Sequence, residues 1–249
     1  MHRTNRFLAS FGADIALIRP HLREVRLRAG QILCEPGDRI RKVYFLHEGA
    51  VSKMMVFEDG AEIECVLIGR EGAVGAMSAL GMHTAVTRDI CHMAARALVI
   101  DVAQLSEAAR TSELIHAALD RYCAWKMSYA IRNGACNARH AVEQRLCRWL
   151  LTCSDVLEEP EIRLPQDVFA KMLGAQRTSI NPILQRLRAD GLIALGRSRL
   201  LLTDRPGLMA RSCECYETMS IVETKMRAAR AQAGGEDRPP LHLRRGSAA

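Results

Sequence analysis

The sequence predicts an α+β protein in which an N-terminal antiparallel β-barrel or jelly roll, a long helix and a C-terminal winged helix-turn-helix unit follow one another. Three observations carry this prediction. Short strand-like runs separated by turns fill residues 26–101, a proline-free helical pattern runs from Leu105 to about Asn137, and two short helical stripes with a basic hairpin follow it. We expect these units at residues 1–104, 105–137 and 138–210, with a helix and a disordered tail at 211–249.

Turn signals at regular intervals indicate that the N-terminal unit is antiparallel. Val25-Arg26-Leu27 alternates before a turn at Gly30, and Glu58-Asp59-Gly60 separates two strand-like runs at residues 52–57 and 62–68. Glycine in such a position allows the positive φ that a tight hairpin requires. Several short strands joined by turns of this kind are typical of a small barrel or jelly roll.

The helical segment after the strands carries one apolar stripe with 4-3-4-3 spacing. It is made of Ile115, Leu119, Tyr122, Lys126 and Tyr129. That spacing is typical of the seam of a coiled coil, which would make the helix a dimer interface. The other interpretation is that the same stripe packs against the chain's own β domain.

Residues 164–195 contain the pattern of a helix-turn-helix unit. Val168, Phe169, Met172 and Leu173 form one helical stripe, Gly174 ends it, and a second stripe follows from Ile180, Ile183, Leu184 and Leu187. In such a unit the second helix lies in the DNA major groove. The alternative is an ordinary helical hairpin with a solvated polar face.

A two-stranded wing with a basic tip follows these helices. Leu192-Ile193-Ala194 and Leu200-Leu201-Leu202 flank Gly196-Arg197-Ser198-Arg199, and cations there can displace counterions from the phosphate backbone. We therefore expect double-stranded DNA as partner, contacted by Gln166, Gln176, Arg177, Thr178, Ser179, Asn181, Arg186, Arg197 and Arg199.

These segments resemble the Crp/Fnr family of dimeric bacterial transcription regulators. The resemblance rests on Leu164-Pro165-Gln166-Asp167, Leu173-Gly174, Gln176-Arg177 and Asp190-Gly191-Leu192-Ile193. It implies a homodimer joined through the long helix, a palindromic operator, RNA polymerase as a further partner, and a sensor domain of the cyclic-nucleotide-binding type. Arg177 falls on the family's main base-reading arginine. Thr178 and Pro182 replace a common glutamate and a second arginine, so we expect a different base preference.

The resemblance also locates a nucleotide cassette, from which the binding residues are missing. The family pattern is Gly-Glu followed about ten residues later by Arg-Ser, and the matching positions here are Gly75, Ala76, Ala85 and Val86. The glutamate that accepts from the ribose and the groups that bind the phosphate are therefore replaced. We expect no cyclic-nucleotide binding by the usual residues and name no cofactor. Arg88 lies on the wrong strand face to substitute.

Composition sets further limits on this chain of 249 residues. A formal net charge of +7 fits a nucleic-acid partner, and the absence of a membrane-length apolar run predicts a cytoplasmic protein without a membrane partner. Its nine cysteines form no Cys-x-x-Cys pair, and most are expected to be buried thiols. Cys213 and Cys215 would point apart on one helix running from Pro206 to about Ala231, so we expect no metal there. A thiol switch at Cys91 or Cys123 stays open.

Two other classes of function remain as alternatives to a transcription regulator. In the first, the helix-turn-helix unit would contact protein rather than DNA, which the basic wing disfavours. The second is an enzyme, since His116 with Asp120 and His140 with Glu143 are possible catalytic pairs. No phosphate loop, nucleophile elbow or metal signature accompanies them, and we expect no catalytic residues.

Overall fold

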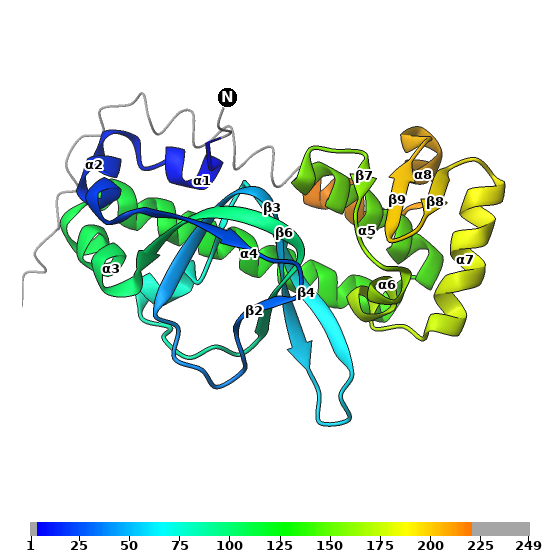
Figure 1. Ribbon diagram of the computed structural model, residues 1–249, viewed down its shortest axis with the longest axis horizontal. Coiled ribbons are helices and arrows are strands. Elements are labelled where there is room, and N and C mark those ends of the chain that lie inside the picture. The colour runs from blue at the N-terminus through cyan, green and yellow to red at the C-terminus, as the bar shows by residue number, and fades with distance from the viewer. Residues whose placement is uncertain (1–3, 221–249) are drawn as a thin grey trace, which may run out of the picture.

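Antiparallel strands build the N-terminal part of the structure, a computed structural model that describes residues 4–220 apart from the side chains of residues 166 and 167 (Figure 1). The sheet has the order β1-β6-β3-β4, with β2 paired to β6 and β5 paired to β3. The strands are β1 (Arg23–Leu27), β2 (Gln31–Cys34), β3 (Lys42–Val56), β4 (Glu62–Ile68), β5 (Ala73–Val74) and β6 (Arg88–Asp101). Within the described residues the order does not return to β1. The predicted α+β class is confirmed, with a jelly-roll-like sheet rather than a closed barrel.

The sheet is organised around β3 and β6, which pair along most of their length with several register shifts. Such bulges bend a strand and increase its twist, which lets two long strands curl over one core. One bend lies at Gly49, whose φ is 72° and where a Cβ atom would come within 2.3 Å of the Ala94 carbonyl oxygen. The predicted hairpin between β3 and β4 is present, and Gly60 has a φ of 82°.

Short helices cover one end of the sheet and lead into the long central helix. They are α1 (Arg6–Ala9), η1 (Gly12–Asp14), α2 (Ile15–Ile18), η2 (Arg19–His21), η3 (Ala76–Leu80) and α3 (Val102–Thr111). The single helix predicted from Leu105 is interrupted before α4 (Glu113–Arg139), because Ser112 is extended. The Ser112 hydroxyl accepts from the Ile115 amide at 3.1 Å and so begins α4.

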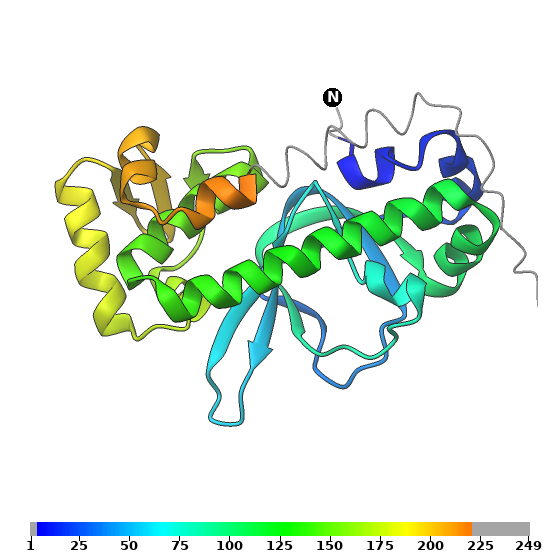
Figure 2. The same ribbon diagram turned by 180° about the vertical axis from the view of Figure 1, so that it is seen from behind.

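The inner face of α4 lies on the β domain along most of the helix (Figure 2). Of the stripe predicted as a dimer seam, Ile115, Leu119, Tyr122 and Lys126 are buried within the single chain. The Tyr122 hydroxyl donates to the Ala73 carbonyl at 3.0 Å, and Lys126 Nζ lies 2.7 Å from Glu71 Oε1. Tyr129 packs on the sheet as well. The predicted seam is therefore wrong, and the other interpretation, packing against the chain's own β domain, is confirmed.

The C-terminal part combines short helices with a three-stranded sheet of order β7-β9-β8. Its elements are α5 (Val142–Leu157), β7 (Glu161–Ile162), α6 (Gln166–Leu173), α7 (Arg177–Ala189), β8 (Ile193–Gly196), β9 (Arg199–Leu202) and α8 (Arg205–Arg211). α4 ends at Arg139 and α5 begins at Val142, so the helical backbone is interrupted at His140. Two arginines of α5 are buried, since Arg145 and Arg148 are 8% and 1% exposed.

The segment after α8 departs from the sequence prediction. The helix expected from Pro206 to about Ala231 ends at Arg211, and Ser212 is extended with φ −76° and ψ 161°. Helical structure resumes at residues 215–220, and the rest of that expected helix and the expected disordered tail lie outside the described residues. Cys213 and Cys215 therefore do not lie on opposite sides of one helix. The expectation of no metal at these two cysteines rested on that helix, so its basis is removed.

One hydrophobic core joins the β domain to the helix-turn-helix helices. Ala50, Met54, Leu67 and Met93 from the sheet belong to the same buried cluster as Trp149 and Phe169. Three successive residues of β4 contact the C-terminal part: Glu62 pairs with Lys171 at 2.8 Å, Ile63 packs at Gly174, and Glu64 accepts from Trp149 Nε1 at 2.6 Å. Among the helices of residues 4–220, none combines the length and apolar character of a membrane span.

Candidate nucleic-acid interface

The predicted helix-turn-helix is present as α6, a tight turn and α7. Gly174 ends α6 with φ 55°, and the apolar residues of both predicted stripes, from Phe169 to Leu187, lie in the core apart from the half-buried Val168. Arg145 supports the turn, because its Nη1 donates to the Leu173 carbonyl at 3.0 Å. A cation bonded to a last-turn carbonyl stabilises a helix C-terminus. The turn is thus fixed from the side of α5.

The outer face of α7 presents polar groups at its first turns. Gln176 is the N-cap, and the side chains of Gln176, Arg177, Thr178, Ser179 and Asn181 are all exposed. Pro182 lies within the helix on the same exposed side. Arg186 is exposed too, but its Nη2 donates to Glu143 Oε2 at 2.7 Å. The side chain of Gln166 lies outside the described residues.

Arg188 shares this surface and was missed by the sequence reasoning. It is exposed in the last turn of α7, eleven residues after Arg177. Because an α-helix has 3.6 residues per turn, two residues separated by about three turns lie on the same face. The spacing of eleven residues from Arg177 could therefore have predicted Arg188 from the sequence.

The wing projects beside α7 from the small sheet (Figure 1). β8 and β9 pair from Ile193–Leu202 to Gly196–Arg199, and Ser198 completes the turn with φ 55°. Arg197 and Arg199 are both exposed at this tip. The Arg199 side chain covers Gly196, where a Cβ atom would meet Arg199 Nε at 2.6 Å. The exposed arginines of α7 and the wing give this end of the molecule a positive surface.

Two family models match the chain over its two parts. The cyclic nucleotide-binding domain matches residues 24–112, and the Crp-like helix-turn-helix domain matches residues 144–211. The chain belongs to the Crp/Fnr family. This is a family of transcription regulators and not of enzymes.

Solved structures of other proteins share this fold. FixK2 from Bradyrhizobium japonicum has a TM-score of 0.68 at 15% identity, over 77% of this chain and 98% of that one. CLP, described as a c-di-GMP-responsive global regulator of Xanthomonas campestris, has a TM-score of 0.64 at 21% identity. That match covers 76% of this chain and 97% of CLP. In sequence, the chain is 46% identical to the HTH-type transcriptional regulator Cmr of Mycobacterium tuberculosis over 54 residues. That match spans 22% of this Crp/Fnr chain and 22% of Cmr.

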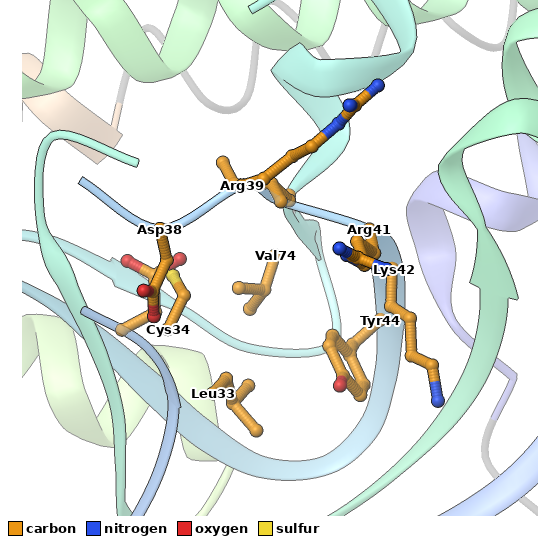
Figure 3. A pocket seen from close by; sticks show the side chains of 11 residues that line it. Leu33, Cys34, Asp38, Arg39, Arg41, Lys42, Tyr44 and Val74 are labelled. Carbon is orange, nitrogen blue, oxygen red and sulfur yellow. The ribbon is translucent and has the colours of Figure 1, made fainter. Parts of the chain in front are cut away.

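The degenerate cassette of this Crp/Fnr chain borders a pocket between β2, β3 and the start of η3 (Figure 3). The pocket has a volume of about 360 Å³, and Gly75 lines it. Ala76 and Ala85 are buried, whereas Val86 is 55% exposed. Arg88 donates to Glu35 at 2.8 Å and pairs with Glu62, and it does not line this pocket.

Both acidic and basic side chains line the pocket. Asp38 and Cys34 lie close together on one side, while Tyr44 and Lys42 lie on the other (Figure 3). Burial, reinforced by Asp89, raises the pKa of the Cys34 thiol to about 12. Burial also raises the pKa values of Cys91 and Cys123 to about 11. A reactive thiol requires a lowered pKa, so these values argue against the thiol switch considered for Cys91 or Cys123.

Proposed function

We propose that this protein is a homodimeric transcription regulator that binds a palindromic DNA operator in a sequence-specific way. The observation that carries the proposal is the set of exposed polar side chains in the first turns of α7. The apolar face of the same helix is buried in the core, and the basic wing lies beside it. This arrangement suits insertion of α7 into a major groove with the wing on phosphate. Arg177 is the proposed reader of guanine, because its guanidinium can donate two parallel hydrogen bonds to O6 and N7.

The proposed DNA contacts divide into two classes. Gln176, Thr178, Ser179 and Asn181 surround Arg177 and would complete the reading of base edges, together with Gln166 at the start of α6. Arg186, Arg197 and Arg199 would contact phosphates. Arg188 joins that second class because of its exposure on α7.

The proposed dimer uses the outer face of α4. Its exposed stripe has 3-4-3-4 spacing and consists of Ala124, Met127, Ile131, Gly134 and Ala138. Met127 and Ile131 are 60% and 66% exposed, which is costly for large apolar side chains that lack a cover. Small residues beside them allow two helices to approach closely. A two-fold axis along this stripe would present two α7 helices to successive major grooves about 34 Å apart.

We further propose an activity that does not require cyclic AMP and includes no catalysis. The replaced residues at Ala76, Ala85 and Val86 support the first point, and the pocket beside Gly75 is the place for any other effector. RNA polymerase is the proposed protein partner at a promoter. His116 and Asp120, one of the pairs considered for catalysis, are both more than half exposed on α4.

The test is selection from a random DNA library with purified, ligand-free protein at moderate salt. We expect enrichment of a near-palindrome whose half-sites lie about one helical turn apart. The matched control is Arg177→Ala, which should lose the enrichment of one base pair per half-site. If the protein retains only salt-sensitive, sequence-independent binding, the ligand-free reader proposed here is wrong.

A further inference from the structure

Four potential metal ligands from distant parts of the chain meet at the end of α4. Cys136 lies in its last turn and His140 is its C-cap, while Cys213 and Cys215 come from the turn after α8. Residues four apart lie on one face of a helix, and the extended backbone at Ser212 turns the other pair toward them. We propose that this cluster binds one zinc ion per chain through three thiolates and the Nδ1 atom of His140.

The distances suit a tetrahedral ion. Cys136 Sγ and Cys213 Sγ are 3.5 Å apart, Cys215 Sγ is 3.8 Å from His140 Nδ1, and all four ligand atoms lie within 4.8 Å of one another. Ligands bound tetrahedrally at about 2.3 Å from zinc are separated by about 3.8 Å. A disulfide would instead require sulfur atoms about 2.05 Å apart.

Glu214 prepares the histidine for this role. Its Oε1 lies 3.1 Å from His140 Nε2, the ring nitrogen that faces away from the sulfur atoms. A carboxylate there holds the proton on Nε2 and leaves the lone pair of Nδ1 for a metal. Such carboxylate–histidine pairs orient metal ligands and raise their basicity.

Buried positive charge beside the cluster also favours a thiolate site. Arg148 is 1% exposed and Arg145 is 8% exposed, and they donate to neutral groups, Asn133 Oδ1 at 2.6 Å and the Leu173 carbonyl oxygen at 3.0 Å. Among the same residues, their Nε atoms have no hydrogen-bond partner. Three thiolates on a dication give a net charge of −1, which would offset part of this charge.

The three thiols of the cluster are enclosed by the protein. Cys136, Cys213 and Cys215 are 0%, 3% and 2% exposed. A divalent metal displaces thiol protons when it binds. The bound ion would tie the end of α4 to the segment after α8.

The first experiment measures metal in the full chain purified under reducing conditions without a metal-affinity tag. We expect about one zinc per chain, and a cobalt-substituted protein with the spectrum of a tetrahedral thiolate site. C213S, C215S and H140A should each lose most of the metal. C123S and H116A, on α4 outside the cluster, should retain it. Any one of three results would overturn the assignment: protein that stays metal-free after zinc reconstitution, a disulfide between Cys136 and Cys213, or bound iron with sulfide.

A second variant separates loss of a ligand from loss of the fold. H140C supplies a fourth thiolate, so it should recover the zinc that H140A loses. In the wild type, a strong chelator should lower the thermal midpoint and added zinc should restore it, with no such response in C215S. If H140C binds no more zinc than H140A while both remain folded, His140 is not a ligand.

Discussion

Glu64 is a carboxyl group enclosed between the two parts of the molecule. Its oxygens accept from Ser52 Oγ and Trp149 Nε1, both at 2.6 Å, and its side chain is almost wholly buried. Burial raises the pKa of Glu64, although the two hydrogen bonds and the charges of Arg148 and Lys126 oppose the rise. The protonated form is therefore favoured in the folded protein more than in the unfolded chain.

The first prediction concerns this carboxyl. Because its pKa is raised on folding, the folded state binds more protons, and the free energy of unfolding should fall as pH rises above the ordinary value of 4.5 toward the folded pKa. E64Q keeps hydrogen-bonding atoms in the same places without titrating and should lose this slope. Urea unfolding across this pH range checks the prediction. Equal slopes in E64Q and wild type would contradict it.

The second prediction concerns Arg177. R177A should weaken binding to the selected operator by about 1–3 kcal/mol and relax discrimination at one base position. Titrations of the operator and of single-base variants measure both effects. R110A is the control, since Arg110 is 71% exposed on α3 in the β domain. An equal loss on every DNA sequence would identify Arg177 as a phosphate contact.

At the scale of elements, α4 has two faces with different tasks. The inner face contacts the sheet through Tyr122, Lys126 and Asn133, whose Nδ2 donates to the Glu64 carbonyl at 2.8 Å. The outer face is built of small and apolar residues around Met127 and Ile131. The inner face thus anchors α4 to its own domain, and the outer face is the one proposed to meet a second copy.

The third prediction tests that outer face. I131D should raise the dimer dissociation constant by at least about tenfold, because two carboxylates would meet across the two-fold axis. Sedimentation over a range of protein concentrations measures it. L17D is the control, since Leu17 is 49% exposed on α2, away from α4's outer stripe. A dimer unaffected by I131D would place the interface elsewhere.

Local signals in the sequence predicted the β hairpin, the helix-turn-helix and the wing, but not the breaks at Ser112 and Ser212. They also did not predict contacts between distant residues. Gly60 and Gly174 predicted the positions of two turns correctly. Both have a positive φ, a conformation that glycine adopts more easily than other residues. The buried apolar stripe of α4 was identified from its spacing, but the surface against which it packs was not. The same spacing is compatible with packing on a sheet and with packing on a second helix. The cluster of Cys136 with Cys213 joins residues 77 positions apart, and no local periodicity reports that distance.

At the scale of the whole molecule, β4 positions the helix-turn-helix relative to the sheet. Glu62, Ile63 and Glu64 each hold a different group of the C-terminal part. Gly174 makes the closest of these approaches, because a Cβ atom there would lie 2.6 Å from the Ile63 side chain. A shift of β4 would therefore move the turn that begins α7.

The fourth prediction uses two glycines with different surroundings. G174A combines backbone strain at φ 55° with a collision at Ile63, whereas G191A has φ 74° and open space around the added methyl. Strain of this kind costs on the order of 1–3 kcal/mol, and the collision should make G174A the more destabilising change. Chemical denaturation of both variants measures the difference. In G174A, the added substitution I63A should recover part of the loss, and equal effects of the two glycine variants would refute the contact.

The core shared by the sheet and the helix-turn-helix helices also sets the order in which the nascent chain can mature. Ala50, Met54 and Met93 leave the ribosome well before Phe169, which covers the same core. At roughly 5–20 residues per second, synthesis of the intervening segment takes several seconds. During that time the β domain carries an uncovered apolar face, which makes it a ready client for chaperones. Translational pausing before α6 would lengthen this window and lower the yield of soluble protein.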